Sequence, residues 1–212
     1  MAGYDLQQSG GAALDLVVIA GSLGGVEALR TICAALPADF PAALAIVQHR
    51  STRQPHLLAE LLATWSTLPV GDATDGELVL GGRIYIAPPD RHMTVTASVR
   101  IALVDGPPIH HVRASAEPLF VSAALAYRTR LIAVVLTGGD GDGSIGIVSA
   151  RNAGALTIAQ DPDTAVCGDM PRRAIATGAV DLVLPLDAIA DALVARVRES
   201  AARGRERPVS SP

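Results

Sequence analysis

The stretch LVVIAGSLGGVEAL, residues 16–29, decides the fold of this chain. Its continuous apolar run over residues 16–20, rich in Val and Ile, is typical of a buried strand. From Gly24 onward, apolar residues recur at helical spacing, at Val26, Leu29 and Ile32. Ser22 is therefore expected on a strand-to-helix turn, where glycines allow close backbone approach and the free N–H groups of the first helical turn favour an anion. A hydroxyl in that position can act as a nucleophile.

Composition limits the classes of protein to which the chain can belong. Its 212 residues are half apolar and carry a net charge of −4, which suits one well-buried domain and not a nucleic-acid-binding protein. Every basic side chain is arginine, which excludes a lysine nucleophile or Schiff base. The two cysteines, Cys33 and Cys167, form no disulfide framework. With no signal peptide and no apolar run of membrane-spanning length, a cytoplasmic location without membrane insertion is expected.

The rest of the chain alternates strands with helices, which predicts an α/β fold with a mainly parallel sheet covered on both faces. Predicted strands span residues 16–20, 43–47, 131–136, 156–159 and 180–184, and predicted helices begin at Gly24 or span 55–65, 115–127, 144–152, 171–176 and 187–202. In the helix over 55–65, one apolar face is expected to contain Leu57, Leu58, Leu61, Leu62 and Trp65. Short alternating segments predict a small antiparallel hairpin over residues 92–104. We expect one domain over residues 14–203, a flexible leader over 1–13 and a disordered tail over 204–212.

Three polar landmarks follow predicted strands: Ser22, His49 and the glycine-rich loop over residues 138–143. Ligands bind at the carboxyl ends of strands in parallel sheets, so these segments are expected to meet. A serine hydroxyl needs a base, histidine is the natural base near neutral pH, and a carboxylate orients the imidazole. Asp140 and Asp142 both qualify as that carboxylate from the pattern alone.

Each landmark also has a less specific interpretation. The turn around Ser22 could be a phosphate cradle for a dinucleotide, although its spacing is not G-x-G-x-x-G. His110 and His111 could ligate a metal, but a solvated loop fits adjacent histidines better. The aspartates of the 138–143 loop superficially resemble a calcium loop that lacks the remaining ligands. The arginines after residue 195 are interpreted as a solvated helix end or a weak docking patch for an acidic partner.

Taken together, the motifs resemble the catalytic domain of the chemotaxis protein-glutamate methylesterases of the CheB type. The matching segments are residues 19–29, 47–49, 85–92, 136–143, 157–161, 168–172 and 179–186, and the resemblance extends over about residues 14–197. It implies a three-layer α/β/α fold with a doubly wound, mainly parallel sheet. It also implies hydrolysis of γ-glutamyl methyl esters on methylated chemoreceptors with release of methanol, deamidation of receptor glutamines in some members, and no cofactor or metal.

The resemblance assigns the nucleophile to Ser22, the base to His49 and the orienting carboxylate to Asp142. It places backbone oxyanion donors near Leu23 and Gly139, and an arginine at the edge of the site at Arg113. The implied partner is the cytoplasmic domain of a methylated chemoreceptor, and the catalytic domain is expected to stand alone, without a receiver domain.

The glycine-rich loop departs from the family pattern Leu-Thr-Gly-Met-Gly-x-Asp-Gly, because Gly139 replaces the methionine and Asp140 the next glycine. An extra carboxylate that points inward would oppose an oxyanion. This departure leaves a second hypothesis open, a catalytically weak or inactive module that binds a receptor segment or signalling partner in the Ser22 cleft. A nucleotide-binding regulator is a third.

Overall fold

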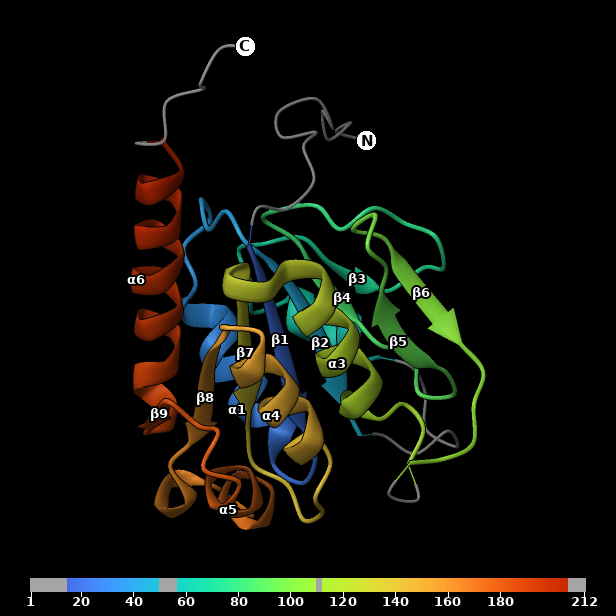
Figure 1. Ribbon diagram of the computed structural model, residues 1–212, viewed down its shortest axis with the longest axis vertical. Helices are drawn as coiled ribbons and strands as arrows, with labels where there is room; N and C mark the ends of the chain where they lie inside the picture. Colours follow the sequence, from blue (N-terminus) through green and yellow to red (C-terminus); the bar gives the residue numbers. More distant parts are fainter. Residues whose placement is uncertain (1–14, 50–56, 110–111, 206–212) are drawn as a thin grey trace.

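The computed structural model describes residues 15–49, 57–109 and 112–205, and its elements form three layers (Figure 1). The middle layer is a seven-stranded parallel sheet in the order β3-β4-β2-β1-β7-β8-β9. Its strands are β1 (Leu16–Gly21), β2 (Ala43–Gln48), β3 (Val70–Asp72), β4 (Ile84–Ile86), β7 (Leu131–Val135), β8 (Leu156–Gln160) and β9 (Leu182–Leu184). The predicted α/β class with a mainly parallel, doubly wound sheet is confirmed.

Helices cover both faces of this sheet because its central strands are apolar on both sides. Leu16 and Val18 of β1 pack into one core cluster, and Val17 and Ile19 pack into the other. The first cluster includes side chains of α3 (Ala116–Tyr127), α4 (Ser144–Asn152) and α5 (Asp169–Ala176); the second includes those of α1 (Gly25–Ala35), α2 (Leu58–Ala63) and α6 (Leu186–Arg205). Short 3-10 turns occur at Arg128–Arg130 and Pro162–Thr164.

The direction of winding reverses between β1 and β7. From β1 the chain moves outward to β2, and it later returns to β7 on the opposite side of β1. Gly21 pairs with Gln48, and Ala20 pairs with Val135, so the carboxyl ends of these three strands lie level with one another. In open parallel sheets such a switch point is where ligands bind.

A two-stranded antiparallel sheet lies beside α3 (Figure 1). Its strands, β5 (His92–Val95) and β6 (Ile101–Val104), form the hairpin predicted over residues 92–104. The Val95 N–H donates to the Ser122 hydroxyl of α3 at 3.0 Å, which fixes the hairpin on that helix.

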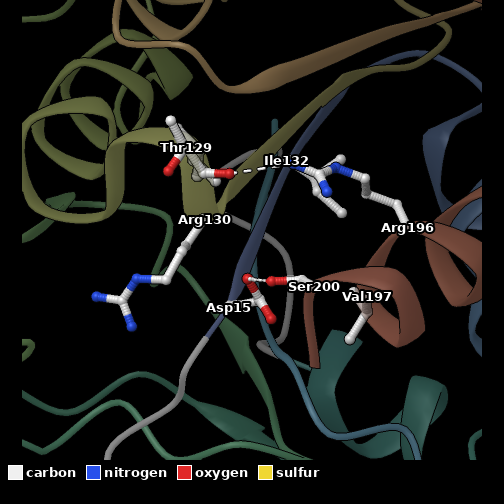
Figure 2. A pocket seen from close by; sticks show the side chains of 8 residues that line it. Asp15, Thr129, Arg130, Ile132, Arg196, Val197 and Ser200 are labelled. Atoms are coloured by element: carbon white, nitrogen blue, oxygen red, sulfur yellow. Dashed lines mark hydrogen bonds between the residues drawn. The ribbon is translucent and has the colours of Figure 1, made fainter. Parts of the chain in front are cut away.

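At the amino ends of β1 and β7, α6 is joined to the sheet (Figure 2). The Ser200 hydroxyl donates to the Asp15 carboxylate at 2.8 Å, and Arg196 donates to the Thr129 carbonyl at 3.3 Å. Burial raises the pKa of Asp15, and the bond from Ser200 opposes that rise. This end of the sheet is opposite to the switch-point end.

Two expectations differ from the structure at particular residues. The helix predicted over residues 55–65 is the shorter α2, whose buried face consists of Leu58, Ala59 and Leu62. Leu57 and Leu61, which were expected on the apolar face, are exposed. Residues 55 and 56 lie outside the described residues. Helix α6 continues to Arg205, past the predicted end near residue 202. The predicted leader over 1–13 and the part of the tail after residue 205 also lie outside the described residues.

Candidate active site

Ser22 directly follows β1 on the turn that leads into α1, as the sequence predicted. Its N–H donates to the Thr137 carbonyl at 2.9 Å, which joins the turn to the loop after β7. Gly24 caps α1 with φ of 81°, a conformation that glycine adopts without strain. A Cβ on Gly25 would lie 2.0 Å from the Gln48 side-chain oxygen, so the turn needs glycine there to pack against β2.

His49 directly follows β2, the neighbouring strand. Its N–H donates to the Gly21 carbonyl at 3.0 Å, so the parallel register of β1 and β2 sets His49 beside the serine turn. Only 7% of the His49 side chain is exposed. Gln48, the last residue of β2, donates its side-chain amide to the Ser22 carbonyl at 2.7 Å. The same register therefore fixes the backbone of both predicted catalytic residues.

Asp142 lies in the loop after β7 and is held from the opposite side by the start of α3. Its carboxylate accepts hydrogen bonds of 2.5 Å from both the Ser115 hydroxyl and the Ala116 N–H, and a longer one from the Glu117 N–H. One oxygen also lies 2.7 Å from the His49 Nε2 atom. The carboxylate is fully buried, and these donors at a helix N-terminus stabilise its charge.

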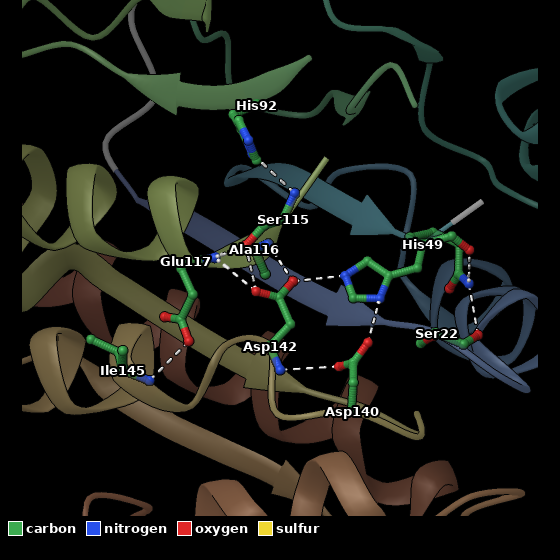
Figure 3. A network of polar contacts seen from close by, with 10 residues as sticks. Ser22, His49, His92, Ser115, Ala116, Glu117, Asp140, Asp142 and Ile145 are labelled. Atoms are coloured by element: carbon green, nitrogen blue, oxygen red, sulfur yellow. Dashed lines mark hydrogen bonds and ion pairs between the residues drawn. The ribbon is translucent and has the colours of Figure 1, made fainter. Parts of the chain in front are cut away.

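Asp140 makes a second contact with the same ring (Figure 3). Its Oδ2 atom lies 3.0 Å from the His49 Nδ1 atom, an ion-pair contact that lacks hydrogen-bond alignment. Its Oδ1 atom accepts a hydrogen bond from the Asp142 N–H at 3.0 Å, which fixes the two aspartates relative to each other. Both carboxylates that the sequence left as alternatives therefore reach His49, one at each ring nitrogen.

These two carboxylates control the protonation of His49. Burial, the largest single effect, lowers the pKa of the ring, but the close contacts and negative charges of Asp140 and Asp142 together outweigh it and raise the pKa to about 9. At neutral pH the ring is therefore an imidazolium in this arrangement. No hydrogen bond between the Ser22 hydroxyl and the His49 ring occurs in the described part of the chain.

The backbone around Ser22 offers hydrogen-bond donors. Within the described residues, the N–H groups of Leu23 and Gly139 make no hydrogen bond, which agrees with the prediction that both donate to an oxyanion. Gly138 holds this arrangement together, since a Cβ there would lie 1.9 Å from the Met170 sulfur and 2.9 Å from the Ser22 Cβ. The loop after β7 can approach the serine turn this closely only with glycine at that position.

The remaining predicted site residues are less well connected. The Nε atom of Arg113 is buried without a hydrogen-bond partner among the described residues. His110 and His111 lie outside the described residues. In the part of the chain that the structure describes, no group of three or more potential ligands is arranged to hold a metal ion. Within the same ranges, no helix has the length and apolarity needed to cross a bilayer.

Several residues of the site were not singled out for it by the sequence. Ser115 was predicted as a helix start, and it does cap α3, but its hydroxyl also binds Asp142. The Thr137 hydroxyl donates to the Leu23 carbonyl at 2.8 Å and accepts from the Cys167 N–H at 2.9 Å. For Ser115, the preference of serine for helix caps was the only local signal. Its bond to Asp142 and the bonds of Thr137 join segments that are distant in the sequence, so no local pattern predicts them.

An open depression of about 370 Å³ adjoins the loop that contains both aspartates. Gly141, Ser144 and Ile145 form one wall, and Arg173 and Thr177 of the α5 region form the other. Ile145 is 64% exposed, and Leu23 and Val166 near the serine turn are exposed to a similar degree. The surface around the site is therefore partly apolar and has a cation on one side.

Comparison with known proteins identifies relatives along almost the whole described chain. The family model for the CheB methylesterase matches residues 17–193. A protein-glutamate methylesterase/protein-glutamine glutaminase of Symbiobacterium thermophilum is 42% identical over 87% of this chain and 51% of its own length. One from Clostridium acetobutylicum is 37% identical over 87% of this chain and 54% of its own. The chain thus spans about half the length of these relatives.

A solved structure has the same fold. The crystal structure of the Thermotoga maritima CheB methylesterase catalytic domain superposes with a TM-score of 0.83 at 37% sequence identity. The match includes 85% of this chain and 97% of that domain.

Proposed function

The chain belongs to the CheB methylesterase family, and from that membership we propose that it hydrolyses glutamate γ-methyl esters on methylated chemoreceptors. The observation that supports this most strongly is the buried Asp142–His49 pair beside Ser22, at the carboxyl ends of three adjacent strands. Serine esterases need this combination of nucleophile, base and orienting carboxylate. The proposal implies a cytoplasmic location, where the cytoplasmic domain of such a receptor lies.

In the first half of the reaction, the neutral His49 ring removes the proton of the Ser22 hydroxyl as its oxygen attacks the ester carbonyl carbon. The N–H groups of Leu23 and Gly139 stabilise the oxyanion that forms. The tetrahedral intermediate collapses with cleavage of the carbon–oxygen bond to the methoxy group, and the imidazolium donates its proton so that methanol leaves. The product is an acyl-enzyme on Ser22.

In the second half, His49 removes a proton from water, and the resulting oxygen nucleophile attacks the acyl carbon. Collapse of this intermediate releases Ser22 and leaves a receptor glutamate carboxylate. Throughout, Asp142 stabilises the imidazolium and fixes the ring orientation. The same groups can expel ammonia from a glutamine amide, the second activity in the names of the relatives, and we include receptor glutamine deamidation in the proposal.

Methanol release from a methylated chemoreceptor cytoplasmic domain tests the proposal. The Ser22→Ala variant is expected to lose roughly 10⁴- to 10⁶-fold in rate, because the members of a triad act as a unit. Ser98→Ala, at an exposed hydroxyl on the hairpin turn, is the matched control and keeps the native rate. Equal release by native protein and Ser22→Ala would refute the role of Ser22, and no release by a folded native protein would refute the proposed substrate.

One observation favours a second candidate, a binding module without catalysis. Both nitrogens of His49 face carboxylates, so the ring offers the serine no free lone pair in this arrangement. A serine-reactive fluorophosphonate distinguishes the candidates. If the protein is an enzyme, the reagent labels Ser22 in the native protein and does not label the His49→Ala variant. If the protein is a binding module, the reagent labels neither of them at any pH.

A further inference from the structure

Asp140 occupies a position that neither the triad nor the oxyanion site accounts for. It lies in the loop after β7, two residues before the buried Asp142, and it contacts the ring nitrogen that Asp142 leaves open. Its Oδ1 atom accepts from the Asp142 N–H, so its other oxygen is held toward His49 Nδ1. A glycine at position 140, as in the family pattern, would place no charge there.

The two ring nitrogens have different tasks in a serine esterase. One donates to the orienting carboxylate, and the other must carry a lone pair to accept the serine proton. Here Nε2 is paired with Asp142 at 2.7 Å, so only Nδ1 remains for Ser22. Asp140 lies 3.0 Å from that atom and, as an acceptor without a proton, favours a protonated Nδ1. Asp140 and Ser22 therefore compete for the same nitrogen.

The other charged groups of this network act elsewhere. Among the described residues, the charges that raise the proton affinity of His49 are Asp140 and Asp142, both from the loop after β7. His92 of β5 accepts from the Ser115 N–H and contacts the Pro107 carbonyl, and Glu117 of α3 accepts from the N–H groups at the start of α4. The Asp142 side chain is fully buried among its donors, whereas 29% of the Asp140 side chain is exposed. Asp140 is thus the carboxylate that can move away.

We propose that Asp140 is a positioning residue that holds His49 as an imidazolium, so that Ser22 acquires its base only when this second carboxylate is displaced or its charge is removed. The inference rests on the proposed function, because it concerns the base of the same reaction. It makes this site a restrained version of the serine esterase site, in which the partly exposed Asp140 side chain holds the base in its charged form.

The test compares the native protein with Asp140→Asn, which keeps the shape of the side chain and removes its charge, and with Asp140→Gly. Asp191→Asn, an exposed aspartate of α6, is the matched control for loss of one negative charge. The first readout is the titration of the His49 ring by NMR, with the signal assigned from its absence in His49→Gln. In native protein its midpoint is expected at about 9. In both Asp140 variants it is expected to fall by about 1 to 3 pH units, the usual effect of a neighbouring opposite charge.

The second readout is the rate of fluorophosphonate labelling at neutral pH. Both Asp140 variants are expected to label about 10-fold faster or more, because the neutral fraction of His49 rises tenfold for each unit that its midpoint falls. Asp191→Asn is expected to match the native protein in both readouts.

Titration midpoints unchanged in both Asp140 variants would overturn the inference, and so would slower labelling at every pH, which would make Asp140 a helper of the reaction. The NMR titration needs no substrate and no turnover. A shifted midpoint with no Ser22 labelling in any form would therefore establish the restraint on His49 and refute the proposed function separately.

Discussion

Raising the pH from about 6 to about 8.5 is expected to lower the free energy of unfolding by about 2 kcal/mol through His49 alone. The pKa of this ring is about 9 in the folded protein and has an ordinary value of 6.5. A raised folded pKa means that the folded state binds the proton more tightly. Its contribution is therefore fully present below pH 6.5 and is lost as the pH rises toward 9.

The magnitude follows from the two pKa values. The folded form at about pH 6 gains about 3 kcal/mol from the protonated ring, and at about pH 8.5 it retains about 1 kcal/mol, which leaves the difference of about 2. Only 7% of the side chain is exposed, so solvent screens the two ion pairs weakly. Burial raises the pKa of the Cys33 thiol to about 12, so the thiol stays protonated in the folded protein and ionises only in part in the unfolded chain at about pH 8.5. This adds a loss of a few tenths of a kcal/mol that is the same in the native protein and in His49→Gln, so it cancels in their comparison.

Urea denaturation at the two pH values, followed by circular dichroism, measures the effect in the native protein and in His49→Gln. The native protein is expected to show the loss, and the variant is expected to lack it. If the two proteins lost equal stability between these pH values, the reasoning from the Asp140–His49–Asp142 contacts would be refuted. A native protein that gained stability with rising pH would refute it as well.

Three further substitutions test the supports of the site. Ser115→Ala removes both the cap of α3 and a donor to Asp142, and it is expected to lower the free energy of unfolding by about 1 to 2 kcal/mol and to slow methanol release; an unchanged urea midpoint would contradict this. Gly138→Ala forces a methyl group against the Met170 sulfur, which is expected to destabilise the fold by about 1 to 3 kcal/mol, measured by thermal denaturation. Thr137→Val keeps the shape of the side chain but removes the hydroxyl that joins two loops, so the free energy of unfolding is expected to fall by about 1 to 3 kcal/mol in the same assay. A melting temperature equal to that of the native protein would contradict this.

The central strands could be predicted because their burial on both faces produces continuous apolar runs, as in residues 16–20 and 131–136. Because Ser22, His49 and the 138–143 loop each follow a strand, their meeting at one edge of the parallel sheet could also be predicted. Helix α2 shows the limit of periodicity. Leu57 and Leu61 fit the apolar face of a longer helix, yet both side chains are exposed in the structure. Their exposure could not be predicted, because the pattern does not say where the helix begins or which of its turns pack against the sheet.

The finer geometry of the site depends on contacts that no local pattern contains. Whether Asp140 or Asp142 orients the ring was undecided from the pattern, and the structure shows contacts from both. Which nitrogen each carboxylate meets depends on the His49 rotamer and on the loop conformation, and both are set by packing between β2, the loop after β7 and α3. The Ser115 hydroxyl is a similar case, since its capping role is local and its bond to Asp142 is not.

The His49–Asp142 pair joins residues that lie 93 positions apart in the chain, on either side of the central strand β1. Neither half of the sheet contains both residues of this pair. Contacts of this long range form late, because a large loop must close before they can stabilise anything. Under the proposed function, the reactivity of Ser22 therefore reports the final step of refolding. In a refolding experiment, we expect the helical signal to return first and fluorophosphonate labelling to begin only when the two halves of the sheet have joined.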